Sequence, residues 1–189
     1  MDDGVNGGLR GELVGLRARH EPDVAILEAE LHDDVAGDAR GSRRAWRPRP
    51  PTSKESFNRI TEPNEGSAAF SVVELATDTL AGEASLWNID SHNRSAHIGV
   101  ALRPAFRGKG FGTDIVRIMC YYGFTVLGLH RLQVDTLSDN HAMIKAAEQV
   151  GFVREGVIRG SAWVLGEFAD DLILGLLADE WSGLRHVGE

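Results

Sequence analysis

The sequence contains a single cysteine and no long apolar run. Cys120 cannot form an internal disulfide, and its apolar neighbours favour a buried structural thiol over a nucleophile. No stretch approaches the roughly 18 apolar residues of a membrane-spanning helix, and the Met1-Asp2-Asp3 start lacks the features of a signal sequence. We therefore expect a cytoplasmic protein that does not associate with a membrane.

Basic residues are too few for general affinity for nucleic acid. Lys and Arg number 20 against 28 Asp and Glu, which gives a formal net charge of −8, and such a balance repels a polyanion. The histidines do not cluster as metal ligands do, so no metal site is expected. The acidic balance is compatible with a cationic acceptor such as an amine, but many ordinary proteins share it.

Length and composition predict one globular domain that covers residues 1–189. The chain is 42% hydrophobic and 25% charged, values at which a core forms and disorder is not expected. Alternation and helical periodicity predict strands at 12–17, 67–75, 80–88, 96–102, 132–136, 158–165 and 170–177, and helices that begin near Pro22, Thr52, Thr113 and Asn140. Three consecutive antiparallel strands then precede the third of these helices. This order disfavours a fold that alternates strand and helix from its start.

Further details of the helices follow from side-chain spacing. In the helix from Thr113, one face is predicted to be apolar, with Ile115, Ile118, Met119, Tyr122 and Val126, and the other to carry Asp114, Arg117 and Tyr121. The helix near Asn140 is expected to have Ser138 or Asp139 as N-cap and Gly151 as C-cap. The segment from Gly37 to Pro51, rich in Arg, Trp and Pro, is expected to be a mobile loop.

The segment from Arg103 to Thr113 has the composition of a phosphate-binding loop. Gly108, Gly110 and Gly112 permit positive φ, so successive backbone N–H groups can turn toward one anion at the start of a helix. Arg107 and Lys109 add positive charge beside them. Charge-assisted hydrogen bonds contribute roughly 1.5–3 kcal/mol each, so several together can hold a pyrophosphate in water.

Two other kinds of phosphate loop fit less well. A Walker loop needs glycine where Arg103 stands, and Ser or Thr where Gly110 follows Lys109. A dinucleotide fingerprint is closer, since a later strand carries Asp135, but Thr113 occupies its third glycine position. That motif also normally opens its domain, whereas about half of this chain precedes the loop.

The loop reads as Arg-x-x-Gly-x-Gly from Arg107 to Gly112, after Leu102-Arg103-Pro104. It resembles the pyrophosphate loop of the GNAT acetyltransferases, which bind acetyl-coenzyme A (acetyl-CoA). Further segments are similar to the branch of ribosomal-protein N-terminal acetyltransferases (RimJ/RimL type): Ala96-His97-Ile98-Gly99-Val100, Gly128-Leu129-His130-Arg131-Leu132, Asn140 and Gly151-Phe152. The resemblance implies an α+β, three-layer fold. Its central sheet is mixed and mostly antiparallel, has about seven strands, is flanked by helices, and splays between the fourth and fifth strands.

The resemblance also implies which residues bind the co-substrate. The strand before the loop would pair with the pantetheine arm, the loop would hold the pyrophosphate, and a backbone N–H near Val100 would face the thioester oxygen. Asn140 would reach the cofactor amides, although it could equally serve only as a helix cap. The residues so implied are Val100, Ala101, Leu102, Arg107, Gly108, Lys109, Gly110, Phe111, Gly112, Thr113 and Asn140.

The groups that would move protons are less well defined. His97 stands where the family commonly has Glu and could relay a proton through water, or it could be only a packed polar residue; Glu83 is a second candidate base. The usual acids of the resembling family are replaced by Met143 and Ala147. Water, Ser138 or a tyrosine of the helix after the loop would then protonate the leaving thiolate, or the thiolate would leave unaided, or the activity would be weak.

The expected acceptor is a primary amine, small or at a peptide N-terminus, and the acetyl group would pass to it directly in a ternary complex. At pH 7, deprotonating a lysine-like amine costs about 4.6 kcal/mol, against about 1 kcal/mol for an α-amine, which favours the peptide N-terminus. Trp46 and Arg47 belong to a loop that is either a solvated connector or, as the resemblance implies, a lid over the acceptor site; with Trp87, they are the predicted acceptor contacts. A catalytically silent CoA-binding module and a nucleotide-cofactor oxidoreductase that uses Asp135 remain as alternatives. The apolar C-terminal hairpin makes a homodimer possible.

Overall fold

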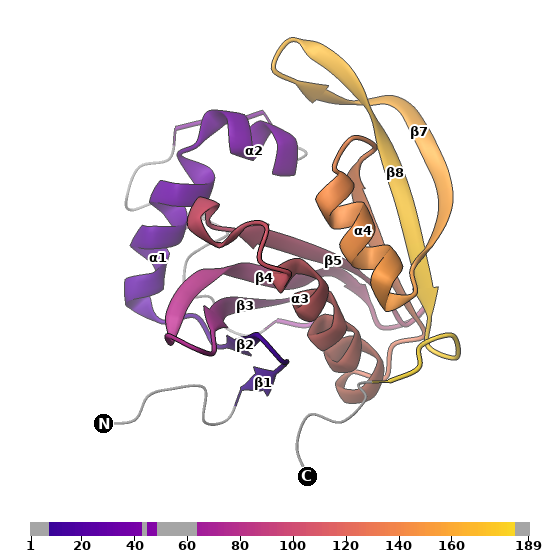
Figure 1. Cartoon of the computed structure of the whole chain (residues 1–189). Helices are drawn as coiled ribbons and strands as arrows, with labels where there is room; N and C mark the ends of the chain where they lie inside the picture. Colours follow the sequence, from indigo (N-terminus) through magenta and orange to yellow (C-terminus); the bar gives the residue numbers. More distant parts are fainter. Residues whose placement is uncertain (1–7, 43–44, 49–63, 184–189) are drawn as a thin grey trace.

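The computed structural model describes residues 8–42, 45–48 and 64–183, which form one eight-stranded sheet with helices against it (Figure 1). The strands lie in the order β1-β2-β3-β4-β5-β6-β8-β7. Their bounds are β1 Leu9–Arg10, β2 Val14–Arg17, β3 Ser67–Glu74, β4 Thr79–Asp90, β5 Ser95–Leu102, β6 Arg131–Leu137, β7 Val153–Val164 and β8 Glu167–Leu177. The seven predicted strands are all present, and the eighth is the two-residue β1.

Helical segments occupy the connections between these strands. They are α1 Glu21–Leu27, the π-helix η1 Glu28–His32, α2 Val35–Gly41, the 3₁₀ turn η2 Pro104–Phe106, α3 Phe111–Cys120, the π-helix η3 Tyr121–Val126 and α4 His141–Val150. No helix of the described segments is long and apolar enough to cross a membrane.

Every strand pair is antiparallel except β5 and β6, which are parallel. This parallel pair is short. Only Ser95 to His97 of β5 pair with Arg131 to Gln133 of β6, whereas β5 stays paired with β4 as far as Leu102. The two strands therefore separate after His97, which confirms the predicted mixed sheet and its splay.

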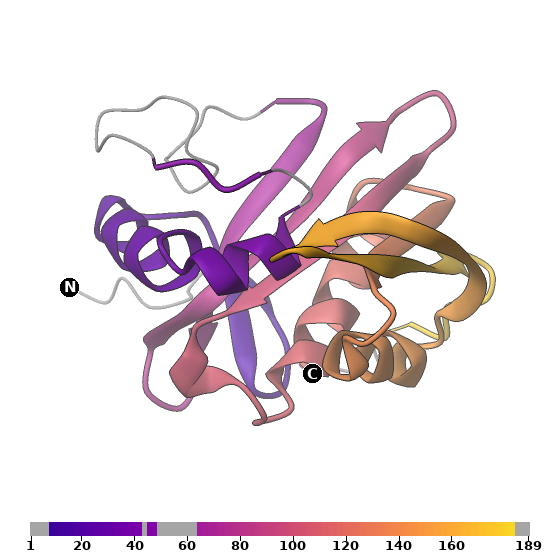
Figure 2. The ribbon, with the colours of Figure 1, turned by 90° about the horizontal axis from the view of Figure 1, so that it is seen from above.

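Alternating residues of β4 show that helices cover both faces of the sheet. Ala84 and Leu86 belong to the main core, which also contains Ile115 of α3 and Ile144 of α4. Glu83, which directly precedes Ala84 in this alternation, faces the opposite side and contacts His32 of η1. Figures 1 and 2 show α1 and α2 lying together, apart from α3 and α4. The predicted three-layer α+β architecture is confirmed.

The segment from Gly37 to Pro51 is not wholly irregular, because α2 continues through its first residues to Gly41. Asp34 starts that helix by accepting a hydrogen bond from the Ala36 N–H. The helix predicted near Thr52 lies outside the described residues.

The helix after the glycine loop differs from its prediction at three points. It begins at Phe111 rather than Thr113, and Val126 is 53% exposed rather than buried. Asp114 was expected to face solvent, yet it is buried because its carboxylate accepts backbone N–H groups of β2 and the residues before it. The predicted burial of Ile115, Ile118 and Met119 is confirmed.

Three predictions for the C-terminal half are confirmed and one is wrong. Gly151 ends α4 at a φ of 115°, and the closing hairpin turns at Leu165 and Gly166. The N-cap is Asn140, whose side chain accepts from the Met143 N–H, and not Ser138 or Asp139. Cys120 is fully buried, as predicted, and burial raises the pKa of its thiol far above the ordinary value.

Candidate active site

The glycine loop has the backbone shape of an anion cradle. Gly108 and Gly110 have φ values of 76° and 83°, in the left-handed region that favours glycine. Gly110 is the N-cap of α3 and supplies no capping side chain, so the first N–H groups of this helix face outward without one. Gly112 lies inside the helix, where a Cβ atom would be 3.6 Å from Ala146 of α4, so its role is close helix packing.

The side chains of the loop are held around the cradle rather than inside it. Arg107 Nε donates to the Leu102 carbonyl at 3.0 Å. Lys109 Nζ lies 4.8 Å from the centre of the Phe106 ring and 3.9 Å from the Glu74 carboxylate. Thr113 donates its hydroxyl to Gln149 of α4. A bound anion would therefore meet mainly backbone N–H groups, with the two cations beside it.

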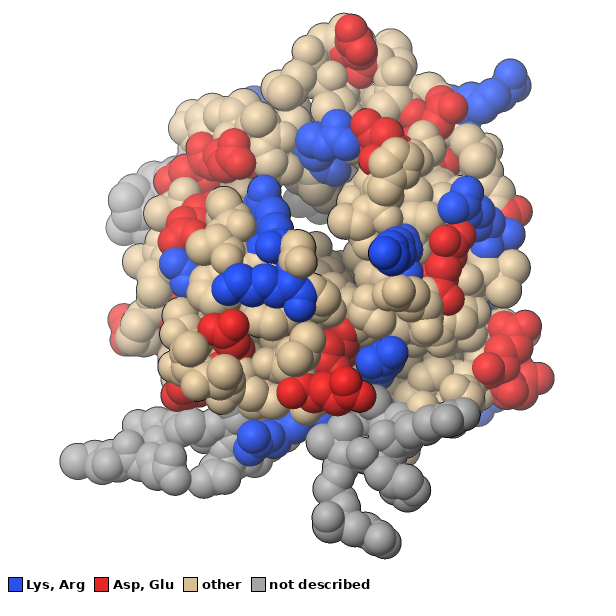
Figure 3. All heavy atoms as spheres, viewed as in Figure 1, with Lys and Arg blue, Asp and Glu red and all other residues tan. Residues whose placement is uncertain are grey.

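The splay leaves one edge of β5 open directly before the cradle. Beyond His97, the backbone of Val100, Ala101 and Leu102 pairs with β4 but not with β6. Figure 3 shows the surface hollowed near its centre, with Lys and Arg atoms on the rim. An extended chain with amide groups and a terminal pyrophosphate fits this combination of a free strand edge and a cradle.

Asn140 lies at the other side of the splay, but both ends of its side chain have partners within the protein. Its Oδ1 accepts from the Met143 N–H at 3.3 Å, and its Nδ2 donates to Thr136 at 2.9 Å. Asn140 is thus a helix cap, and a contact to a cofactor stays a prediction.

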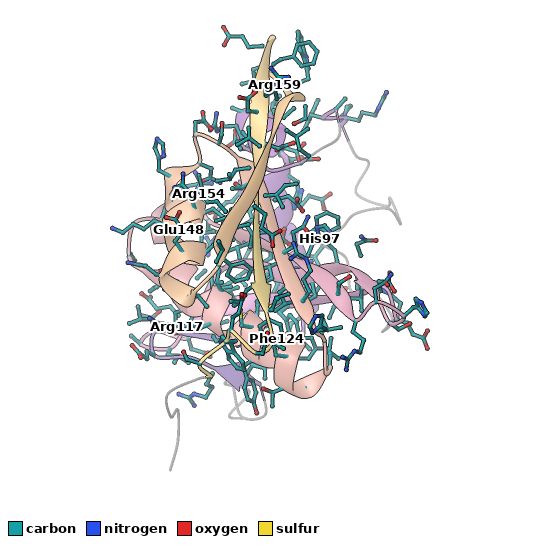
Figure 4. The ribbon with its side chains drawn as sticks, turned by 90° about the vertical axis from the view of Figure 1, so that its right-hand side faces the viewer. His97, Arg117, Phe124, Glu148, Arg154 and Arg159 are labelled. Atoms are coloured by element: carbon teal, nitrogen blue, oxygen red, sulfur yellow. The ribbon has the colours of Figure 1, made fainter. Side chains whose placement is uncertain are left out.

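His97 stands at the point where β5 and β6 separate, and both of its ring nitrogens have partners. Nδ1 is 2.5 Å from Asp135 Oδ2, and Nε2 is 3.4 Å from Asn88 Nδ2. The ring lies against Trp87, with 4.3 Å between ring centres. His97 is partly exposed, and Figure 4 shows it on the side of the sheet away from Glu148 of α4.

Asp135 is a site residue that the sequence alone does not reveal, because the sequence indicates a role for it only as the acid of a dinucleotide site. In the structure it pairs with His97 and also accepts a hydrogen bond from Gln133. A usable signal was present. If the strand around Leu132 lies beside the strand around Ile98, alternation places 133 and 135 on the face that carries 97.

Glu83 is on the same face but in a different environment. Its carboxylate is buried, bonded to Arg19 at 2.9 Å and to His32 Nε2 at 3.3 Å. Asp38 lies 3.7 Å from the other nitrogen of His32. Arg19 offsets the charge of Glu83 within a buried cluster of charged side chains. We therefore assign Glu83 a structural role rather than that of a catalytic base.

The residues considered as proton donors to the leaving thiolate are not well positioned for that role. Ser138 is exposed at the end of β6, where its backbone bonds to Asp170. Met143 packs against the core and Ala147 is fully buried. Tyr121 and Tyr122 follow α3, so a ten-residue helix, about 15 Å long, separates them from Gly110.

The predicted acceptor residues are not all together. Trp87 packs on His97. Trp46 donates its indole N–H to the His32 carbonyl, which ties it to η1, and Arg47 is exposed. Across the described ranges, no group of three or more His, Cys, Asp or Glu side chains is placed to hold a metal ion.

The acetyltransferase (GNAT) domain family matches residues 15–153. The chain belongs to the GNAT acetyltransferase family. This confirms the predicted family, the N-acetyltransferase class and acetyl-CoA as the co-substrate, and it does not favour the silent module or the oxidoreductase.

Two curated relatives and one solved structure illustrate the family's range. The chain is 35% identical over 109 residues to the "Putative ribosomal N-acetyltransferase YdaF" of Bacillus subtilis, covering 58% of the chain and 60% of the relative. It is 31% identical over 99 residues to the spermidine N(1)-acetyltransferase of Vibrio cholerae, covering 52% and 57%. Both alignments span less than two thirds of these relatives' length.

The solved structure is similar over a longer range. The spermidine N-acetyltransferase of Vibrio cholerae, in complex with CoA and spermine, superimposes with a TM-score of 0.75 at 24% identity, covering 89% of this chain and 97% of that one. At this identity the likeness establishes the GNAT fold.

Proposed function

We propose that this GNAT protein transfers an acetyl group from acetyl-CoA to a primary amine, directly, while both substrates are bound. One observation carries the proposal: His97, packed against Trp87, stands where β5 and β6 separate, and β5 leads into the cradle at Gly108 and Gly110. Acetyl-CoA supplies the acetyl group as a thioester.

The chain's own groups then have separate tasks. Backbone N–H groups from Gly108 to Thr113 hold the pyrophosphate, and β5 from Val100 to Leu102 pairs with the pantetheine amides. A backbone N–H near Val100 donates to the acyl oxygen, where negative charge develops.

His97 removes the proton from the attacking amine, directly or through water. It is partly exposed and has a carboxylate partner, whereas Glu83 is already engaged with Arg19 and His32. Thiolate release needs little from the protein, because water or Ser138 can provide a proton at the exposed end of β6.

The acceptor is an amine, and the names of two relatives suggest which amines to test as substrates. The spermidine N(1)-acetyltransferase of Vibrio cholerae and the "Putative ribosomal N-acetyltransferase YdaF" both match this chain at over 30% identity. A small polyamine and a peptide N-terminus are therefore the acceptors to test. Trp87, beside His97, and Trp46 with Arg47, after α2, are the side chains proposed to contact the acceptor.

We also propose that the protein forms a homodimer through the β7–β8 hairpin. This hairpin is the edge of the sheet and projects beyond the body of the molecule (Figure 1). Its large apolar side chains, among them Trp163 and Phe168, are exposed by 61% and 70%.

The experiment follows CoA thiol release with a panel of spermidine, spermine and short peptides with free N-termini. His97→Ala should lower kcat by roughly 10²- to 10⁴-fold, the usual contribution of a general base, without changing the Kd of acetyl-CoA. His92→Ala, at an exposed position on the neighbouring turn, serves as the matched control. Unchanged kcat in His97→Ala would show that His97 is not the base. If no amine caused release of the CoA thiol, the proposed acetyltransferase activity would be refuted.

A further inference from the structure

The hydrogen bonds around His97 determine which ring nitrogen carries the proton. An ionised carboxylate only accepts hydrogen bonds, so the 2.5 Å contact with Asp135 requires the proton to be on Nδ1. Nε2 then has a lone pair, which is the partner that the Asn88 amide N–H needs at 3.4 Å. Both contacts specify the same neutral tautomer, with Nε2 as the acceptor atom.

Asn88 reaches this position through an unusual backbone. Its φ is 51°, in the left-handed region, within an irregularity where the pairing of β4 and β5 shifts between Trp87 and Asp90. Asn tolerates this region better than most residues. The bend points the amide at His97, and strain of this kind is often found at functional sites.

Asp135 is itself held by neighbours on the same face of the sheet. Gln133 donates to Asp135 Oδ1 at 2.9 Å and accepts from Arg131 at 3.0 Å. Arg131 in turn forms a two-pronged ion pair with Glu155 of β7, which holds the pKa of Glu155 below its ordinary value. One continuous series of polar contacts therefore runs from the edge strand to His97.

Strand β8, which lies between β6 and β7, leaves room for the ion pair between Arg131 and Glu155. Gly175 of β8 lies under it, and a Cβ atom there would be 2.3 Å from Glu155 Oε1 and 2.7 Å from Arg131 Nη1. Any side chain at 175 would displace the pair. Residues of β6, β8 and β7 therefore together determine the position of the Arg131–Glu155 ion pair.

We propose that Asp135 is a positioning residue that keeps the proton of His97 on Nδ1, so that Nε2 is the atom that takes the proton of the acceptor amine. The inference rests on the proposed function of His97 as base. As the amine attacks, its N–H bond breaks, the electron pair stays on nitrogen and a new N–H bond forms at Nε2. The imidazolium is stabilised by the Asp135 charge and the Trp87 face, and its added proton then passes to solvent.

The test combines kinetics with a direct reading of the tautomer. Protein labelled with ¹⁵N in histidine is measured by NMR near pH 9, and the His97 signals are assigned with His97→Gln. Wild type should show the proton on Nδ1, and Asp135→Asn should show a mixture or the proton on Nε2, because an amide can also donate. The same variant should lose about 10²-fold or more in kcat while keeping its Kd for acetyl-CoA.

Two further variants separate positioning from folding and from the loss of a charge. Asp135→Glu should restore the Nδ1 tautomer and part of kcat, and Asp179→Asn, at an exposed position, should match wild type in both. A proton on Nε2 in wild type, or an unchanged tautomer in Asp135→Asn, would overturn the proposal. If the tautomer changes as expected but no amine is acetylated, the role of Asp135 stands and the proposed function fails.

Discussion

At the scale of single residues, Asp23 shows how a buried carboxylate becomes dependent on pH. Burial tends to raise its pKa, but hydrogen bonds from Arg17, the His20 backbone and Ser71 outweigh this and lower it below the ordinary 3.8. The Arg17 contacts are 2.6 and 3.0 Å, and the Ser71 contact is 2.7 Å. Asp23 thereby joins the start of α1 to β2 and β3.

Because the folded state lowers the pKa of Asp23, its contribution to stability is present above pH 3.8 and is lost as pH falls through the lower, folded value. The free energy of unfolding should therefore decline below about pH 4, and Asp23→Asn should make this decline shallower while lowering stability at pH 7. Urea unfolding at several pH values measures both. Asp33→Asn is the exposed control, and an equal pH slope in Asp23→Asn and wild type would contradict the account.

The roles of some single residues can be predicted from the sequence, whereas the roles of others cannot. Gly108 and Gly110 were predictable because positive φ is a local demand that glycine satisfies. Asp23, Asp114 and Asp135 were not, because their partners come from distant segments and an aspartate alone indicates neither burial nor a partner. His97 was found as a candidate, but its partner Asp135 follows only from the pairing of β5 with β6.

At the scale of elements, α3 is fixed to the first strands by one carboxylate. Asp114 accepts backbone N–H groups of Glu12, Leu13 and Val14 at 3.1, 2.8 and 3.0 Å. Gly11 is required for this approach, since a Cβ there would lie 2.4 Å from Asp114 Oδ2. The helix that carries the cradle at its start is thus held to the sheet edge next to it.

Asp114→Ala should lower the free energy of unfolding by about 3 kcal/mol, because it leaves three backbone donors without their charged acceptor. Asp114→Asn, which keeps one acceptor oxygen, should cost less. Arg117→Ala, one turn further along α3 (Figure 4), should stay within about 0.5 kcal/mol of wild type. Chemical denaturation gives all three values, and an Asp114→Ala protein as stable as Arg117→Ala would contradict this role.

Elements themselves were largely predictable. Period-two alternation places the strands, and the resemblance of the loop implies the splay, which the short β5–β6 pairing confirms. Boundaries were less accurate. α2 begins at Val35 and extends to Gly41, into a segment predicted to be irregular. Val126 is predicted to lie on an apolar face, but the chain there forms a π-helix, whose period differs from that of an α-helix.

At the scale of the whole molecule, the β7–β8 hairpin carries more than half of the large apolar side chains that are exposed among the described residues. Its exposed large apolar side chains are Val153, Val157, Ile158, Trp163, Leu165 and Phe168. An edge strand with such a surface is a ready site for pairing with another chain.

If the proposed dimer forms there, sedimentation equilibrium should give a dimer for wild type and a monomer for Phe168→Lys. Val126→Lys, which also places a charge on an exposed apolar residue but on η3, should remain dimeric. A wild-type monomer at all concentrations would refute the dimer and leave the active-site account unchanged.

We expect the loop from Arg107 to Thr113 to bind acetyl-CoA through its backbone N–H groups. The decisive experiment is isothermal titration of acetyl-CoA into wild type, Gly110→Glu and Gly128→Glu. Both substitutions place Glu at a positive φ, 83° and 65°, but only the first adds negative charge at the cradle. We predict micromolar binding to wild type and Gly128→Glu and none to Gly110→Glu. Equal binding by the two variants, or no binding by wild type, would contradict the account.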